Sequence, residues 1–291
     1  MTLSAEHRRV LARVGIAYGA ALAAAVLVGL CLRGRHPILV AAAADLAATL
    51  VVFAFGVAAD NSSLYDPYWS VAPLPIALYW SLSDGAVGPR DALVLLAVGA
   101  WGIRLTWNCL DRWRSLDHED FRYRAIRART GWLYWPASLL AIHLMPTAWV
   151  FLGLLPLYPA LAAPARPPGW LDLAAAAAAL GGAAVEAVAD RQLRRFLQGR
   201  TDPAAVLDTG LWARSRHPNY LGEVLFWWGL LLFGLAADPG KGWTAVGAIS
   251  ITALFVLVSV PWMDRRMLAR HPAWAERMRR VPALLPRLGR R

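Results

Sequence analysis

Charged side chains are scarce in this sequence. They make up 17% of its 291 residues, whereas a soluble domain carries about 25%. The alternation of apolar and polar residues that marks a β-strand is also absent, which argues against a membrane β-barrel. Helices are the remaining way to satisfy the backbone within lipid. These absences exclude an ordinary soluble domain and predict an all-α polytopic membrane helix bundle.

Cysteines are few as well. Cys31 and Cys109 each lie at the end of a hydrophobic segment, and such a pair indicates neither a disulfide framework nor a metal site. No spacing of histidine and cysteine fits a zinc site, so we expect no metal. The N-terminal apolar run over 14–32 exceeds the about 7–15 residues of a signal-peptide core, and we interpret it as a retained anchor.

Long apolar blocks fill most of the chain. At about 20 residues per span, clear candidates lie near 11–32, 37–59, 91–110, 132–157, 169–189, 220–237 and 243–262. A shorter stretch over 70–83 carries Pro73 and Pro75 and suits a tilted or half-buried helix. The sequence therefore predicts seven or eight transmembrane helices.

Arginine gathers in alternate loops. The rich segments are 111–130, 190–217 and the tail after Trp262. Because positive charge is retained on the cytoplasmic side, we predict that these segments and the C-terminus are cytoplasmic; counting 70–83 as a span places the N-terminus there too. Loop arginines of this kind account for the pI near 10.6, so we expect no nucleic-acid partner.

Ionisable residues occur inside several predicted spans, where each costs at least about 2.5–3.5 kcal/mol unless it finds a partner or water. Two groups follow helical spacing: Trp101, Arg104 and Asn108 on one helix face, and Glu186, Asp190 and Arg194 on another. The second group has an alternative interpretation, in which acid and base pair along a helix that leaves the membrane. The isolated Asp45 and His143 are interpreted as an interhelical hydrogen-bond partner and a satisfied interior residue.

The densest chemistry lies in the segment 208–223. Pro218 suits the first turn of a helix, whose start would present free N–H groups beside Arg214, Arg216 and His217 as a phosphate site. Asn219 and Glu223 share a face, next to Tyr220, and would contact amide, ribose or adenine groups. The alternative is a basic cap for lipid headgroups.

This segment, Gly210-Leu-Trp followed by Arg216-His-Pro-Asn-Tyr-Leu-Gly-Glu223, resembles the C-terminal signature of the steroid 5-alpha-reductase-like family, and especially its bacterial members. Related signatures occur in membrane sterol reductases and isoprenylcysteine carboxyl methyltransferases. Further similar stretches are 61–73, 101–105, 119–123, 186–193, 265–267 and 281–286. The resemblance implies a single integral membrane domain over 1–291, with variable N-terminal helices at 1–60 and a reductase-like core at 61–291, in a bacterial inner membrane.

Reductases of this family bind NADPH in a cavity open to the cytoplasm and pass hydride to an enone carbon. By position, Asn219, Glu223 and Asp190 match cofactor-contacting residues of the steroid enzymes, Glu186 stands where those enzymes have Asn, and Arg104 matches a basic position. Together with the basic residues above, the candidate cofactor-binding set is Arg104, Asn108, Glu186, Asp190, Arg194, Arg214, Arg216, His217, Asn219, Tyr220, Glu223, Arg265 and Arg266.

The resemblance implies that Asp66 and Trp101 stand where the steroid enzymes have their catalytic Glu and Tyr. Trp donates a hydrogen bond but cannot deliver a proton. Tyr65 or Tyr68 would then supply the proton, with Asp66 held neutral by burial. The alternative interpretation of this cluster is a proline-bounded helix start with interfacial aromatics.

Three functions remain open. The first is a membrane oxidoreductase that reduces a C=C bond of a lipophilic substrate with NADPH. The second is an S-adenosylmethionine-dependent membrane methyltransferase of a lipid or prenylcysteine-type substrate; there a paired Glu-Glu commonly follows the last helix, whereas Met263-Asp-Arg-Arg-Met267 has one acid. The third is a non-enzymatic lipid-binding or transport protein, which would have no nucleotide affinity. The expected partners are a lipophilic small molecule and the bilayer, with no obligate protein partner.

Overall fold

The structure is a computed structural model that describes residues 4–83, 85 and 87–286, and this part of the chain contains helices and no strands. Large apolar side chains such as Leu27, Ile103 and Leu257 are more than half exposed, as suits contact with lipid. Seven helical stretches are long and apolar enough to cross a membrane: Ala5–Cys31, Pro37–Ala58, Pro89–Arg112, Phe121–Leu154, Trp170–Gly199, Pro218–Ala237 and Pro239–Arg270. The predicted all-α polytopic membrane bundle is confirmed.

Four of these stretches are single helices labelled α1 (Ala5–Cys31), α2 (Pro37–Ala58), α5 (Pro89–Arg112) and α9 (Trp170–Gly199), and α10 (Pro218–Ala237) is a fifth. The other two change helix type along their length because prolines interrupt the regular backbone hydrogen bonds. One comprises α6 (Phe121–Thr130), a 3-10 turn at Gly131–Leu133, α7 (Tyr134–Ser138), a π-helical turn at Leu139–Leu144 and α8 (Met145–Leu154). The last comprises a 3-10 helix at Pro239–Ala245, α11 (Val246–Leu254), a π-helical turn at Phe255–Ser259 and α12 (Val260–Arg270).

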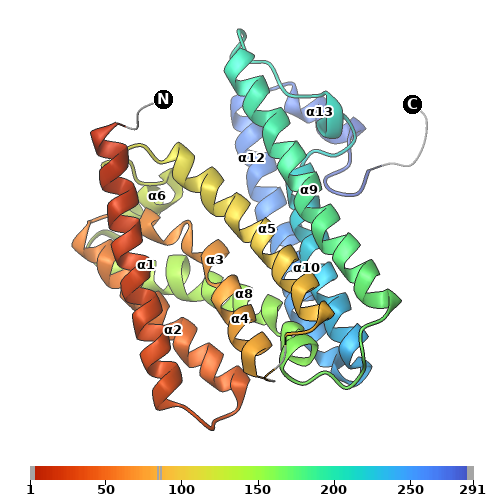
Figure 1. Ribbon diagram of the computed structural model, residues 1–291. Coiled ribbons are helices and arrows are strands. Elements are labelled where there is room, and N and C mark those ends of the chain that lie inside the picture. Colours follow the sequence, from red (N-terminus) through yellow and green to blue (C-terminus); the bar gives the residue numbers. More distant parts are fainter. Residues whose placement is uncertain (1–3, 84, 86, 287–291) are drawn as a thin grey trace.

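The short proline-containing stretch over 70–83 determines at which end of the bundle α5 begins. It forms α3 (Tyr68–Val71) and α4 (Pro73–Ser83), after a 3-10 turn at Ser62–Tyr65, and leads the chain from the end of α2 to the end of the bundle where α5 begins. Both termini consequently lie at the same end of the molecule (Figure 1). The segment therefore runs between the two ends of the bundle, beside seven stretches that are long enough to span a membrane.

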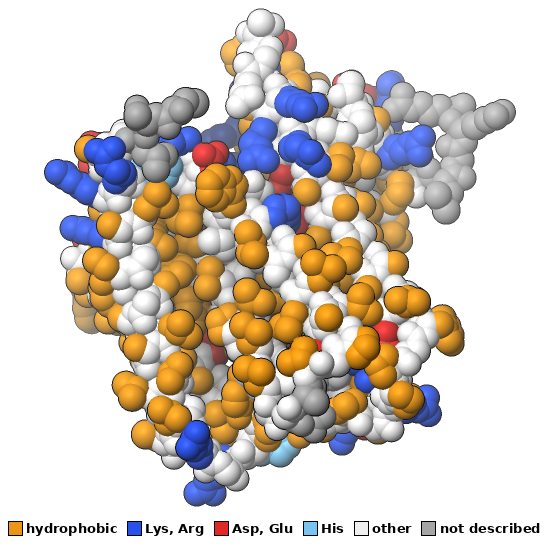
Figure 2. Space-filling model, in the orientation of Figure 1, with side chains coloured by type: hydrophobic (Ala, Val, Ile, Leu, Met, Phe, Trp, Pro, Cys, Tyr) orange, Lys and Arg blue, Asp and Glu red, His pale blue; other side chains and the backbone are white. Residues whose placement is uncertain are grey.

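The basic side chains gather at the end that carries the termini (Figure 2). That end also holds α6, the loop after α9 and α13 (Trp274–Arg280), the arginine-rich parts of the sequence. By the positive-inside rule we expect this end to face the cytoplasm, and we call it the cytoplasmic end. The turn between α1 and α2, with Arg33 and Arg35, lies at the opposite end.

Glycines let α9 and α10 pack at close range. A Cβ atom on Gly182 of α9 would lie 2.6 Å from the carbonyl oxygen of Gly222, and one on Gly222 of α10 would lie 2.7 Å from the Cβ of Glu186. One on Gly229 would lie 2.5 Å from the backbone nitrogen of Ala179. Such distances exclude any side chain. This packing brings Glu186 directly against the turn of α10 that carries Glu223.

A folded cap covers the cytoplasmic end of α9 and α10. Trp212, in a 3-10 turn at Gly210–Ala213, donates its indole N–H to the carbonyl oxygen of Ala189 at 3.0 Å. The backbone nitrogens of Arg216 and His217 donate to the carbonyls of Pro282 and Ala283 at 2.9 and 3.0 Å. The C-terminal segment is thereby tied to the start of α10.

Candidate functional site

The two polar helix faces found in the sequence lie opposite each other. Arg104 on α5 forms ion pairs with Glu186 and Asp190 on α9, the latter at 3.1 Å between Nη1 and Oδ2. Arg194 of α9 donates to Oδ1 of Asn108 on α5 at 3.0 Å. Asp190 therefore pairs across to α5, which contradicts the interpretation of acid and base pairing along α9 alone.

Helix α10 completes this cluster with Glu223. The indole N–H of Trp101 donates to Oε1 of Glu223 at 3.2 Å, and that of Trp227 donates to Oε2 at 3.1 Å. Glu186 and Glu223 are both buried, at 4% and 6% exposure. We call Trp101, Arg104, Glu186, Asp190 and Glu223 the intramembrane cluster.

Two groups at this cluster keep hydrogen-bonding capacity. The Nε atom of Arg104 is buried and has no hydrogen-bond partner among the described residues. The half-buried Asn219, one helical turn before Glu223, has no side-chain hydrogen bond within that same part of the chain. Buried polar groups are normally satisfied. Their free capacity suits a polar ligand.

The start of α10 is organised around Asp264, which the sequence did not identify as a partner of Arg216 and His217. Pro218 lies in the first turn, as predicted. Arg216 pairs with Asp264 of α12 at 2.8 Å and donates to the carbonyl of Val281 at 2.6 Å. Asp264 also accepts from Nε2 of His217 and the indole of Trp274, both at 3.0 Å. Arg216 and His217 are thus engaged inside the protein, and their predicted role as phosphate ligands has no structural support.

Other predicted basic residues stay accessible at the cytoplasmic rim. Arg214 and Arg265 are exposed. The half-buried Arg266 has its guanidinium 3.7 Å from the ring centroid of Phe121, which stacks on Trp262. Arg122, about half exposed, interacts electrostatically with Tyr220 near the start of α10. These arginines offer donors to an anion at the mouth of the bundle.

The predicted catalytic tyrosines do not converge on Asp66. The Tyr65 hydroxyl lies 2.8 Å from Oγ1 of Thr147, and the Tyr68 hydroxyl donates to Oδ1 of Asp45 at 2.8 Å. This second contact confirms Asp45 as an interhelical hydrogen-bond partner. Asp66 instead accepts from the hydroxyl of Tyr123 on α6. Tyr65, Asp66 and Tyr68 are close in sequence, but their side chains form hydrogen bonds in three different parts of the structure.

Asp66 lies in the connection between α2 and α3, outside the spans. Burial raises the pKa of its carboxyl to about 6, although the hydrogen bond from Tyr123 and the nearby Arg122 act in the opposite direction. Arg122 approaches Asp66 only to 4.0 Å. The pKa of Asp66 is therefore raised, as expected, and its hydrogen-bond partner is Tyr123.

Trp101, placed by sequence beside Asp66, belongs to the helix core. Its ring stacks on Phe226 at 4.5 Å between centroids and meets Trp69 edge-on at 5.7 Å. A Cβ atom on the neighbouring Gly102 would lie 2.5 Å from the carbonyl oxygen of Ser70. Trp101 therefore bridges α3, α5 and α10 and holds Glu223 rather than Asp66.

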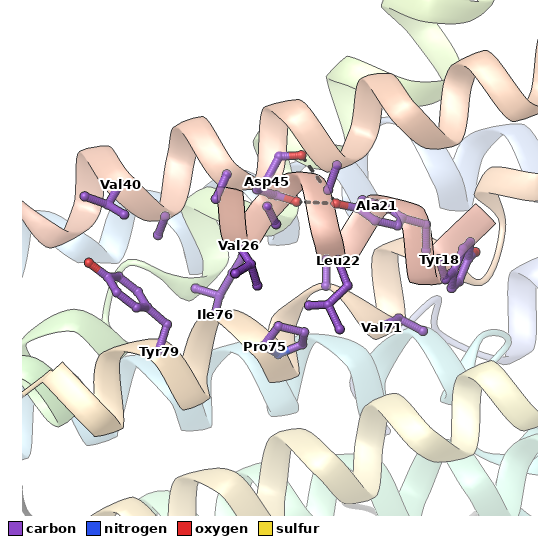
Figure 3. A pocket seen from close by; sticks show the side chains of 16 residues that line it. Tyr18, Ala21, Leu22, Val26, Val40, Asp45, Val71, Pro75, Ile76 and Tyr79 are labelled. Atoms are coloured by element: carbon purple, nitrogen blue, oxygen red, sulfur yellow. Dashed lines mark hydrogen bonds between the residues drawn. The ribbon is translucent and has the colours of Figure 1, made fainter. Parts of the chain in front are cut away.

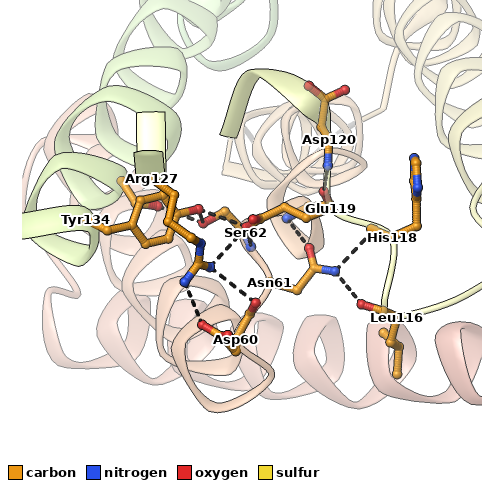
Figure 4. Close-up of polar contacts among 11 residues, drawn as sticks. Asp60, Asn61, Ser62, Leu116, His118, Glu119, Asp120, Arg127 and Tyr134 are labelled. Carbon is orange, nitrogen blue, oxygen red and sulfur yellow. Dashed lines mark hydrogen bonds and ion pairs between the residues drawn. The ribbon is translucent and has the colours of Figure 1, made fainter. Parts of the chain in front are cut away.

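A second polar network joins the start of the Ser62–Tyr65 turn to the loop before α6 (Figure 4). Glu119 accepts from the backbone nitrogen of Ser62 at 2.9 Å and from the Tyr134 hydroxyl at 2.8 Å. Asn61 donates to the carbonyl oxygens of Leu116 and His118, and Arg127 lies 3.9 Å from the ring centroid of Tyr134. This network holds the connection that carries Asp66, and no spacing in the sequence linked its parts.

His143 is only partly satisfied. Its Nδ1 lies 3.0 Å from the carbonyl oxygen of Ser138, while Nε2 is buried with no hydrogen-bond partner in the described chain. The interpretation of a fully satisfied interior histidine therefore holds for one ring nitrogen.

The fold and the intramembrane cluster define a multi-pass helical membrane protein with a polar site near its cytoplasmic end. A family model described as "Protein of unknown function (DUF1295)" matches residues 52–281, and the chain belongs to this family, which is part of the steroid 5-alpha-reductase-like superfamily. The chain is 25% identical over 263 residues to the "Uncharacterized protein C594.04c" of Schizosaccharomyces pombe, covering 82% of this chain and 76% of the yeast protein. No solved structure matches the chain significantly.

Proposed function

We propose that this protein is an NADPH-dependent membrane reductase of a C=C bond in a lipophilic substrate. The observation that carries the proposal is the intramembrane cluster, in which Arg104 pairs with Glu186 and Asp190 of α9. The buried Glu223 of α10 is held there by Trp101, and accessible arginines lie at the nearby rim. This arrangement of carboxyl groups in the cluster and arginines at the rim suits a ligand that is polar at one end and multiply anionic at the other. The motif resemblance to bacterial members of the steroid 5-alpha-reductase-like family also supports a bacterial cytoplasmic membrane as the location.

The residues present fit such a cofactor. Glu223, Glu186 and Asp190 offer acceptors for amide and ribose groups, and the free capacity of Arg104 Nε and Asn219 supplies donors. Phosphate groups would meet the rim, formed by Arg122, Arg214, Arg265 and Arg266. When bound, NADPH supplies a hydride to an electron-poor carbon.

The chain's own groups would handle the proton. Asp66, with its pKa raised to about 6 by burial, retains a proton more readily than an exposed aspartate. Tyr123, hydrogen-bonded to it, connects the carboxyl to α6. In this proposal Asp66 replaces Tyr65 and Tyr68 as the proton donor, and Trp101 orients Glu223.

A second candidate function also has an observation in its favour. The intramembrane cluster holds three carboxyl groups and one arginine, Arg104, and two indoles contact Glu223. Acids beside aromatic rings suit a cation, such as the sulfonium of S-adenosylmethionine. That cofactor would make the protein a methyltransferase of a lipid or prenylcysteine-type substrate.

Isothermal titration of the purified protein in nanodiscs with NADPH, NADH and S-adenosylmethionine separates the two candidates. We expect NADPH to bind more than tenfold tighter than the other two. The double variant Arg265→Gln/Arg266→Gln should weaken NADPH binding at least fivefold, while Arg33→Gln/Arg35→Gln at the opposite end should not. Binding of S-adenosylmethionine alone would reject the reductase in favour of the methyltransferase.

A further inference from the structure

A cavity between α1, α2 and α4 lies apart from the intramembrane cluster. Its volume is about 200 Å³, more than ten times the about 15 Å³ that one water requires. Alanines of α1 and α2, Ala21, Ala25, Ala41, Ala44 and Ala48, line its walls. Because these side chains are short, two helices that otherwise pack together leave space between them.

The cavity opens toward lipid. Leu22 and Val26 of α1, which line it, are 52% and 53% exposed on the lipid-facing side of the helix, and Tyr79 of α4 is 36% exposed. An apolar molecule in the bilayer therefore reaches the cavity without passing through water.

One carboxyl group faces this apolar space. Figure 3 shows Asp45 of α2 opposite Pro75 and Ile76 of α4. Tyr68 donates to Oδ1 of Asp45, while Oδ2 has no hydrogen bond among the described residues although Asp45 is only 5% exposed. An unsatisfied carboxyl oxygen costs free energy in lipid unless a donor reaches it.

The other hydroxyl groups of the cavity are directed elsewhere. Tyr18 donates to the carbonyl oxygen of Leu64 at 2.9 Å. Tyr79 lies at the far end beside Val40 (Figure 3). Recognition of a polar group in this cavity therefore depends on Asp45 with its partner Tyr68.

We propose that this cavity binds a long-chain alcohol from the bilayer, with its hydroxyl donating to Asp45. The hydroxyl of an alcohol can donate a hydrogen bond to an ionised carboxylate oxygen. A ketone has no donor, and an alkane has no polar group. The site is independent of the proposed reductase activity, because Tyr68 faces this cavity whereas the next residue, Trp69, packs on Trp101 of the intramembrane cluster.

Photolabelling in phosphatidylcholine nanodiscs tests the proposal. The probe is 1-hexadecanol with a diazirine in its chain, and adducts are located by peptide mass spectrometry. We expect labels within 18–26 and 71–79, displaced at least tenfold better by 1-hexadecanol than by 2-hexadecanone or hexadecane. Equal displacement by all three, or strongest displacement by hexadecylamine, would overturn the proposal.

Two pairs of variants tie the signal to this cavity. Val26→Trp fills it and should reduce labelling at least fivefold, while the adjacent, similarly exposed Leu27→Trp should not. Asp45→Asn keeps the shape but introduces an amide donor, so 2-hexadecanone should compete as well as 1-hexadecanol. Tyr79→Phe should leave the preference for the alcohol intact. Unchanged labelling in Val26→Trp would contradict the assignment.

Discussion

Asp264 joins three side chains at the cytoplasmic start of α10. It is 4% exposed and accepts hydrogen bonds from Arg216, His217 and Trp274. Removing one partner of a buried ion pair leaves the other charge without compensation, which costs about 3–5 kcal/mol. The position of the α10 start therefore depends on this one carboxyl group.

We expect Asp264→Asn to lower the thermal unfolding temperature strongly, because the amide cannot balance the charge of Arg216. Asp202→Asn, which changes an exposed loop aspartate that accepts from Ala204, should have little effect. Tryptophan fluorescence during heating in detergent measures both. Equal unfolding temperatures for the two variants would show that the Asp264 contacts contribute little.

Asp66 should make stability depend on pH. Its pKa is raised to about 6 in the folded protein from the ordinary 3.8, so folding favours the protonated form. Its contribution is therefore fully present below about pH 4 and is lost as the pH rises through about 6. We expect the unfolding temperature to fall between pH 5 and 7.5, and Asp66→Asn to flatten this change; Asp60→Asn, at a largely exposed neighbouring carboxyl, should not. The same slope in all three proteins would contradict the raised pKa.

At the scale of elements, the site depends on how closely α9 approaches α10. The sequence predicted both helices, and the spacing of Glu186, Asp190 and Arg194 correctly predicted one polar face. The pairing of that face with α5 could not be predicted, because it arises from packing between segments far apart in sequence. For the same reason the sequence could not predict that Asp264 pairs with Arg216.

Two adjacent glycines of α9 give a matched test of this contact. A Cβ on Gly182 would lie 2.6 Å from backbone atoms of α10, whereas one on Gly181 meets nothing within 4 Å. We expect Gly182→Val to separate the helices, lower the unfolding temperature and abolish NADPH binding, while Gly181→Val leaves both nearly unchanged. Size-exclusion profiles show whether the protein remains folded. Tolerance of Gly182→Val in both measurements would contradict the close approach.

At the scale of the whole molecule, hydropathy was sufficient to find the seven spans, because lipid requires long apolar helices. It was less informative for α3 and α4, since a short proline-containing segment resembles both a span and a buried loop. The structure places both termini at one end and Arg35 at the other. This arrangement predicts opposite accessibility for the two ends.

In a protein lacking Cys31 and Cys109, single cysteines at Arg214→Cys and Arg35→Cys report the topology. A maleimide that cannot cross membranes should label the first only in inverted vesicles and the second only in intact cells. Labelling of both from the same side would mean that the α3–α4 segment does not cross.

The central claim is that the intramembrane cluster of α5, α9 and α10 holds a dinucleotide. Native mass spectrometry of the protein mixed with equal concentrations of NADPH and S-adenosylmethionine tests it most directly. We predict a one-to-one adduct with the mass of NADPH that Glu223→Leu removes, while Glu276→Leu, on the exposed face of α13, retains it. An adduct of S-adenosylmethionine, or a NADPH adduct that survives Glu223→Leu, would contradict the claim.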